Sequence, residues 1–201
     1  MEKLYKPNQI EWEKLYSQNG DRHKNKYPSD LIVGWVKRNF SDFNKTEIEK
    51  MKCLDFGCGW CNNLFFLKNE GFQSYGIDFS ERAVQHNKPF FGNNIRCCNG
   101  TNIPFENDFF DFCIDRSSIQ HNSKEDIFFI YKEIYRVLKK NGKLFSVLLK
   151  KGFFDIQTTT LEESELRQAL KMFKINEINY LSSTINNGSE EYISYLIDVI
   201  K

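Results

Sequence analysis

From Cys53 onward the chain alternates short apolar runs with amphipathic segments, and this alternation limits the folds open to it. The runs CLDF, QSYGID, NIRCC and FFDFCID each predict a strand. Helices are predicted between them for NNLFFLKNEG and for SERAVQHNK, which we expect Ser80 to cap and Pro89 to end. Strands that alternate with helices form a parallel sheet with helices on both faces, and ligands of such sheets bind at the carboxyl ends of the strands.

The remaining sequence extends this pattern at both ends. YPSDLIVGWVKRNF predicts a helix that begins at Pro28 or Ser29. SKEDIFFIYKEIYRVLKKNG predicts a long helix that ends at Asn141 and Gly142, before the strand KLFSVLL. The tail contains the predicted helix LEESELRQALKMF and the strands KINEINYLSS and EEYISYLIDVIK, joined by a turn at NNGS. Because no helix separates these two strands, they predict an antiparallel pair at one edge of the sheet.

Length and composition favour one compact domain over 1–201. With 201 residues, 40% of them hydrophobic, the chain is long enough for one core and too apolar for disorder. We expect 1–50 to form a lid and flanking helices, 51–150 the cofactor-binding half, and 151–201 the last helix with the antiparallel strand pair.

Charge and hydropathy narrow the partners. The net charge of +1 gives no broad electrostatic attraction to nucleic acid or to an anionic membrane. No apolar run approaches the roughly 18 residues of a membrane helix, and the first 20 residues contain charges and no apolar core of a signal peptide. We therefore expect a cytoplasmic protein, monomeric or homodimeric, that binds neither nucleic acid nor membranes.

The six cysteines raise the question of a metal site or a disulfide. Cys58 and Cys61 have the C-x-x-C spacing, but no second such pair and no histidine-rich spacing completes a site. Cys53 and Cys113 lie in apolar strand runs, where free cysteine behaves as a small hydrophobic residue. We expect no metal site.

The segment LDFGCGWC places Gly57 and Gly59 directly after the first strand. Glycines there let the backbone approach a ligand, and the next helix offers free N–H groups. A dinucleotide site of the G-x-G-x-x-G type needs a third glycine at position 62, which is Asn62 here, and the Gly-Lys-Ser/Thr of a P-loop is missing. These glycines alone also fit a tight strand-to-helix turn.

Four segments in order resemble the class I S-adenosylmethionine-dependent methyltransferases of the compact small-molecule type. LDFGCGWC is similar to the first motif of that family, with Cys61 where a third glycine is expected. GIDFS resembles the acidic motif of the second strand, NGTNIPFENDFFDFCIDRSSIQH the stretch across the third and fourth strands, and IYRVLKKNGKLFSVLL the approach to the fifth. The resemblance implies a Rossmann-like, doubly wound, seven-stranded sheet, mostly parallel with an antiparallel last strand, and S-adenosylmethionine as cofactor, released as S-adenosylhomocysteine.

The resemblance also implies roles for residues along these motifs. Asp78 would accept both ribose hydroxyls, although a charge at a helix N-terminus is its simpler explanation. Asp55 would attract the methionine ammonium, and Phe79 would lie against the adenine. The expected cofactor-binding residues are Asp55, Gly57, Cys58, Gly59, Asp78, Phe79, Asn99, Gly100, Thr101, Asn102, Asp115, Arg116 and Ser117. Asn99 departs from the family, which often has aspartate there. Cys61 is small enough to fit at the third glycine position, with narrowing of the methionine end of the pocket as the alternative.

The chemistry itself asks little of the protein, since methyl transfer from a sulfonium needs chiefly alignment and exclusion of water. His121, just beyond the fourth strand, is the candidate general base, and a structural histidine near the next helix is the alternative. Trp12, Tyr16, Arg22 and Tyr27 are candidates for a lid over the substrate, or else for ordinary packing.

The expected acceptor is a small molecule, such as a sugar or another metabolite of a bacterial biosynthetic pathway. Two other functions stay open on the sequence: a non-catalytic S-adenosylmethionine-binding partner of another protein, and a nicotinamide-dependent reductase.

Overall fold

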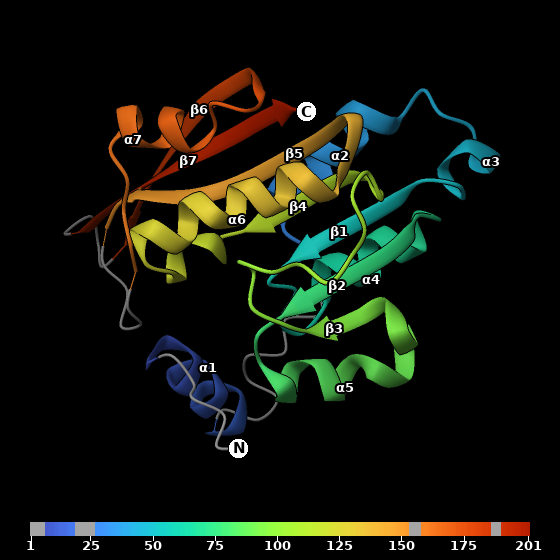
Figure 1. The fold of residues 1–201 in the computed structure, drawn as a ribbon, viewed down its shortest axis with the longest axis horizontal. Helices are drawn as coiled ribbons and strands as arrows, with labels where there is room; N and C mark the ends of the chain where they lie inside the picture. The colour runs from blue at the N-terminus through green and yellow to red at the C-terminus, as the bar shows by residue number, and fades with distance from the viewer. Residues whose placement is uncertain (1–6, 19–26, 153–157, 186–189) are drawn as a thin grey trace.

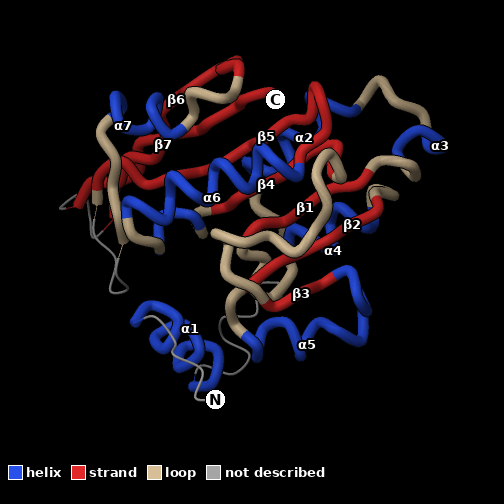
Figure 2. The backbone as a smooth tube through the Cα atoms, in the orientation of Figure 1, coloured by secondary structure: helices blue, strands red, loops and turns tan. Residues whose placement is uncertain are grey.

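The computed structural model describes residues 7–18, 27–152, 158–185 and 190–201. Its strands form one seven-stranded sheet in the order β3-β2-β1-β4-β5-β7-β6, side by side across the molecule (Figure 2). The strands are β1 Lys52–Phe56, β2 Gln73–Asp78, β3 Ile95–Cys97, β4 Phe110–Arg116, β5 Leu138–Lys151, β6 Lys174–Ile185 and β7 Glu190–Ile200. The first five are parallel, and β7 runs antiparallel to both β5 and β6. The expected mostly parallel, doubly wound sheet with an antiparallel last strand is confirmed.

Helices pack on both faces of this sheet (Figure 1). They are α1 Pro7–Gln18, α2 Asp30–Phe40, α3 Lys45–Ile48, α4 Asn62–Asn69, α5 Glu81–Phe91, α6 Lys124–Val137 and α7 Glu163–Ala169, with short 3-10 turns η2 Gly92–Asn94 and η3 Ile119–His121. One buried cluster joins α6 and α7 to the sheet, and another joins α2 and α4 to the opposite face. Ile130 and Tyr131 of the first and Ile32 and Trp35 of the second are almost fully buried. Within the described residues, no helix is long and apolar enough to cross a membrane.

The long helix α6, which leads into β5, is shorter than the sequence predicts. The α6 helix ends at Val137, not at Asn141 and Gly142, because Leu138 already pairs with Phe110 of β4. Val137 and Leu138 are both fully buried, so sheet pairing takes over where the last helical turn was expected. Asn141 adopts a left-handed φ of 64° within β5, between Leu138 and Lys143, where the pairing with β4 shifts register.

The expected end of α5 at Pro89 is also wrong, since the helix continues to Phe91. A proline in the last turn removes only one N–H donor, and Phe91 gains burial against the cluster of Cys58, Leu64 and Val84 by staying helical. The expectation of a lid and flanking helices over 1–50 gave no bounds for α1. This helix lies beyond the carboxyl ends of β1 and β2, where the sheet places the ligand site (Figure 1).

Candidate cofactor and substrate site

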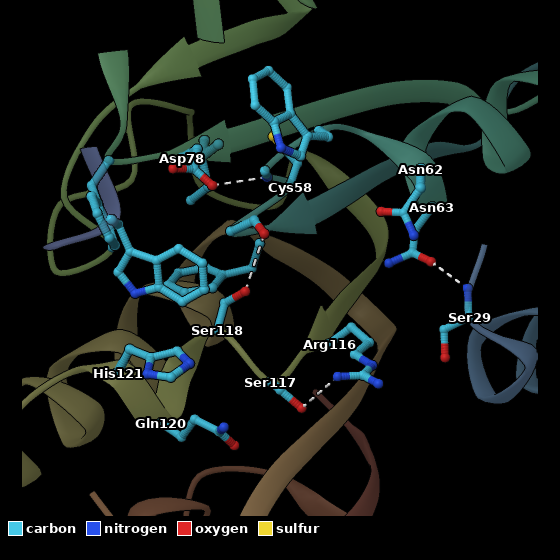
Figure 3. A pocket seen from close by; sticks show the side chains of 18 of the residues that line it. Ser29, Cys58, Asn62, Asn63, Asp78, Arg116, Ser117, Ser118, Gln120 and His121 are labelled. Atoms are coloured by element: carbon cyan, nitrogen blue, oxygen red, sulfur yellow. Dashed lines mark hydrogen bonds between the residues drawn. The ribbon is translucent and has the colours of Figure 1, made fainter. Parts of the chain in front are cut away.

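A cavity of about 890 Å³ opens at the carboxyl ends of β1, β2 and β4 (Figure 3). Its walls come from the loop after β1, the end of β2, the segment after β4, and the inner face of α1. The expected site residues that line it are Gly57, Cys58, Gly59, Asp78, Phe79, Gly100, Arg116, Ser117, His121, Trp12 and Tyr16. Segments far apart in the sequence therefore meet around one cavity at the end of the sheet where an α/β fold binds its ligands.

The loop after β1 needs glycine for conformation and for space. Gly57 and Gly59 have positive φ angles of 66° and 49°. A Cβ on Gly57 would lie 2.3 Å from the side chain of Ser118, and one on Gly59 would lie 2.8 Å from the Tyr16 hydroxyl. Ser118 Oγ donates to the Gly57 carbonyl at 3.1 Å. The two glycines thus bring bare backbone to the cavity between β4 and α1.

Asp78 is the last residue of β2 and lines this cavity, and it is almost entirely buried. Its Oδ2 accepts the Gly59 N–H and its Oδ1 accepts the Ser80 N–H, both at 2.8 Å. Burial raises the pKa of Asp78 to about 6, although the backbone donors act in the opposite direction. Each oxygen keeps capacity for one further hydrogen bond, so the carboxylate is held in place and still able to accept from a ligand.

Two further carboxylates lie behind the cavity wall. Asp115, at the end of β4, is fully buried and accepts from Ser146 Oγ at 2.6 Å and from the Ser118 N–H at 2.8 Å. Burial raises its pKa to about 6. Asp55, in β1, has its Oδ2 buried without a hydrogen-bond partner among the described residues. Burial and then the charges of Asp115 and Asp78 raise the pKa of Asp55 well above its usual range.

These three carboxylates give the site a negative character that suits a cation. A ligand with a positive group near Asp55 would supply the partner that its Oδ2 lacks and would relieve the repulsion among the three. S-adenosylmethionine carries an ammonium and a sulfonium, so the residues present fit it.

The two cysteines of the loop, Cys58 and Cys61, belong to one buried cluster, but only Cys58 lines the cavity. Cys58 lines the cavity, whereas Cys61 is fully buried and packs with Leu64 and Val84. Its φ of 62° is left-handed, the conformation that the missing third glycine would adopt freely. The alternative, narrowing of the pocket by Cys61, does not occur, because its side chain lies outside the cavity lining. In the described part of the chain, no three His, Cys, Asp or Glu side chains gather as metal ligands.

Some of the expected site residues lie away from the cavity lining. Asp55 and Asp115 lie behind it, as described above. Asn99, Thr101 and Asn102 belong to the loop after β3, of which Cys98 and Gly100 line the cavity. The Asn99 side-chain oxygen accepts from the N–H and the hydroxyl of Thr101, both at 3.1 Å, so it is engaged within its own loop. Tyr27 is 79% exposed. Arg22 falls outside the described residues.

The α1 helix covers the cavity through contacts with the loops that build it. Gln9 Nε2 donates to the Phe79 carbonyl at 3.0 Å, and Glu13 Oε1 accepts the Glu81 N–H at 2.7 Å. Trp12 meets His121 edge-on, with ring centroids 5.1 Å apart. The helix therefore spans from the start of α5 to η3.

Sequence reasoning missed about half of the lining. The additional residues are Leu15, Pro28, Ser29, Asp30, Phe56, Trp60, Asn62, Asn63, Ile77, Cys98, Ser118, Gln120 and Asn122. Several directly neighbour an expected residue, so the rule that ligands bind at strand ends would have found Ser118 and Gln120. Ser29 is different, because its N–H donates to Asn63 Oδ1 at 2.9 Å. No local sequence pattern predicts this contact between distant segments.

A glycine loop after β1 and a buried carboxylate at the end of β2, on a sheet of this order, define a Rossmann-like fold. Residues 54–146 match the family model described as a methyltransferase domain, and this segment belongs to that family. The resemblance to class I S-adenosylmethionine-dependent methyltransferases is thereby confirmed. The cofactor of that family is S-adenosylmethionine, which leaves as S-adenosylhomocysteine.

Solved structures share the fold over most of the chain. Magnesium protoporphyrin IX methyltransferase from Synechocystis PCC 6803, with bound S-adenosylmethionine, has a TM-score of 0.71 at 15% identity over 98% of this chain and 99% of its own. Burkholderia thailandensis 1,6-didemethyltoxoflavin-N1-methyltransferase, with bound 1,6-didemethyltoxoflavin and S-adenosylhomocysteine, has a TM-score of 0.70 at 14% identity. The match covers 96% of this chain and 86% of that protein. The [4+2]-cyclase SpnF has a TM-score of 0.65 at 16% identity, and the match covers 86% of this chain and 81% of SpnF. No curated protein sequence matches the chain. At these identities the likeness establishes the fold alone. One of the three proteins, SpnF, is a cyclase.

Proposed function

We propose that this protein is an S-adenosylmethionine-dependent methyltransferase that acts on a small-molecule acceptor. The observation that carries the proposal is the buried Asp55 Oδ2, which lacks a partner among the described residues while Asp78 and Asp115 add negative charge around it. A buried, repelled carboxylate is costly unless a cation meets it. The methionine ammonium of the cofactor is such a cation, and it would reach Asp55 past the bare backbone of Gly57.

The other residues have complementary roles in the proposed complex. Asp78 accepts the ribose hydroxyls on the lone pairs that Gly59 and Ser80 leave free. Phe79 lies against the adenine, and the backbone around Gly100 meets its edge. Arg116 and Ser117, after β4, close the inner side of the cofactor.

Bound S-adenosylmethionine supplies an electrophilic methyl group on a positively charged sulfur. The protein aligns the acceptor and excludes water from the reaction. The α1 helix covers the cavity for this purpose, held by Gln9 and Glu13. His121, which is 9% exposed and lines the cavity, takes the proton that the acceptor atom loses.

The size and covering of the cavity support a small acceptor. About 890 Å³ lies within the range of sites for small ligands and cofactors, and α1 closes one side of it. The net charge of +1 gives no broad electrostatic attraction to a nucleic acid.

Calorimetric titration with S-adenosylmethionine, S-adenosylhomocysteine and NADH tests the cofactor. We expect micromolar binding of the first two and none of NADH; preferential NADH binding would favour the reductase instead. Formation of S-adenosylhomocysteine over a panel of small acceptors then tests catalysis. A folded protein that binds the cofactor and methylates no acceptor would support the non-catalytic binding partner.

A further inference from the structure

Two residues that line the cavity beside His121 carry hydrogen-bond donors that have no acceptor among the described residues. The first is the indole Nε1–H of Trp12, which is buried and has no hydrogen-bond partner in the part of the chain that the structure describes. Trp12 lines the cavity and packs edge-on against the imidazole of His121. A buried N–H without an acceptor destabilises the folded protein, so a donor in this position is a sign of a missing ligand atom.

The second donor is the side-chain amide nitrogen of Gln120. Gln120 Oε1 accepts the Leu149 N–H of β5 at 2.8 Å, and this bond fixes which end of the amide is oxygen. The Gln120 carbonyl is used as well, by the Thr159 N–H at 2.8 Å. Gln120 is 2% exposed and lines the cavity. Its Nε2 has no acceptor among the described residues, so it is the atom through which Gln120 meets a ligand.

The two donors lie apart from the residues proposed to bind the cofactor. Figure 3 shows Gln120 next to His121, below Ser118, while Asp78 lies at the other end of the view. Along α1, the Tyr16 hydroxyl lies against Gly59 in the cofactor loop, and Trp12, one turn earlier, faces His121. The donor pair therefore flanks the histidine proposed as base, on the acceptor side of the cavity.

We infer that the acceptor molecule carries a carbonyl or carboxylate oxygen, which Trp12 Nε1–H and Gln120 Nε2–H bind beside His121. The inference rests on the proposed function, and it names the class of substrate. Two N–H groups on either side of one histidine suit the lone pairs of an sp² oxygen or of a carboxylate. A site with such buried donors rejects an analogue that lacks the oxygen, because the donors then stay unpaired.

The probes are benzoate, benzamide and benzylammonium, which share one ring and differ in the group attached to it. Benzoate and benzamide present an oxygen acceptor, and benzylammonium presents donors only. The readout is the indole N–H resonance of Trp12 in ¹⁵N-labelled protein saturated with S-adenosylhomocysteine. The chain has three tryptophans, so Trp12→Phe assigns the resonance directly. Trp35 is the internal control, because its Nε1–H already donates to Asp198 Oδ2 at 2.9 Å.

We expect benzoate or benzamide to move the Trp12 resonance downfield while that of Trp35 stays fixed, and benzylammonium to cause no downfield shift. Gln120→Glu keeps an oxygen for the Leu149 N–H and replaces the amide donor by a carboxylate. It should weaken benzoate binding at least about tenfold. Absence of a downfield shift with both oxygen probes would overturn the inference.

The methionine carboxylate of the cofactor is the other source of the same chemistry. If Trp12→Phe and Gln120→Glu each leave the affinity for S-adenosylhomocysteine within about twofold, the donors serve the acceptor. A tenfold loss in both would assign them to the cofactor and overturn the inference. If the unaltered protein binds no S-adenosylhomocysteine, the proposed function fails, and the same probe titration on the ligand-free protein still decides whether the donors bind an oxygen.

Discussion

The backbone N–H of Gly59 donates a 2.8 Å hydrogen bond to Oδ2 of Asp78, which ties the glycine loop after β1 to the end of β2. This bond joins the two elements on which the proposed cofactor site depends. It also leaves the carboxylate oriented toward the cavity before any ligand arrives. A preorganised acceptor of this kind loses little freedom on binding.

Replacement of that carboxylate should therefore cost affinity. In Asp78→Ala, the ribose hydroxyls lose their charge-assisted hydrogen bonds, and we expect the Kd for S-adenosylhomocysteine to rise at least about tenfold by calorimetry. Asp111→Ala is the matched control, since Asp111 accepts from Lys52 N and Lys139 Nζ at the opposite end of the sheet. A folded Asp78→Ala variant with unchanged affinity would remove Asp78 from the site.

The affinity should also depend on pH, because the pKa of Asp78 is raised to about 6. Below that value the carboxyl takes up a proton and one of its oxygens no longer accepts, so cofactor binding weakens. We expect the affinity for S-adenosylhomocysteine to be constant between pH 7 and 8 and to fall below pH 6, by at most about tenfold per pH unit for one proton. Titrations of Asp78→Asn should show a flatter profile, and an equally steep one would assign the dependence to another group.

Asp55→Asn should separate stability from binding. The raised pKa of Asp55 means that the folded state resists its ionisation, so the ionised group destabilises the folded protein at pH 7. This penalty is relieved as the pH falls and the carboxyl is protonated. The neutral amide should thus raise the free energy of unfolding of the ligand-free protein at pH 7, by about 1 kcal/mol, in chemical denaturation. It should also weaken binding of S-adenosylhomocysteine, because the ammonium loses its counter-charge.

A less stable Asp55→Asn variant would mean that the buried carboxylate already has a compensating partner. Asn63→Ala is a suitable comparison, since Asn63 lines the same cavity and carries no charge.

Local patterns predicted the sheet and several of the loop residues that line the candidate cavity, because both are encoded in short segments. The strand run before Gly57 and the cap at Ser80 each act within a few residues, so the glycine loop and Asp78 could be placed from the sequence. The ends of α5 and α6 could not be placed from the sequence, because burial of Phe91 and pairing of Leu138 with Phe110 are tertiary effects. Gln120 gains its orientation from Leu149 of another strand, which a single segment does not reveal.

His121→Ala tests the proposed base. We expect the affinity for S-adenosylhomocysteine to stay within about twofold, while turnover of a hydroxyl acceptor falls by about 10² or more. The pH–rate profile should lose its ascending limb as well. Thermal unfolding is the necessary companion measurement, because Trp12 packs on His121. A large loss of stability with little change in the rate of the folded fraction would identify a structural histidine instead.

Cys61→Gly restores the third glycine of the loop. Cys61 has a φ of 62°, which costs a residue with a Cβ about 1 kcal/mol or more, and glycine relieves this strain. The variant also loses a fully buried side chain next to Leu64 and Val84, so the two effects oppose one another. We expect the free energy of unfolding to change by no more than about 1 kcal/mol and the Kd for S-adenosylhomocysteine to stay unchanged.

Gly59→Ala is the contrasting variant, because its Cβ would lie 2.8 Å from the Tyr16 hydroxyl and should weaken binding at least about tenfold. A several-fold gain or loss of affinity in Cys61→Gly would place this thiol in the cavity after all.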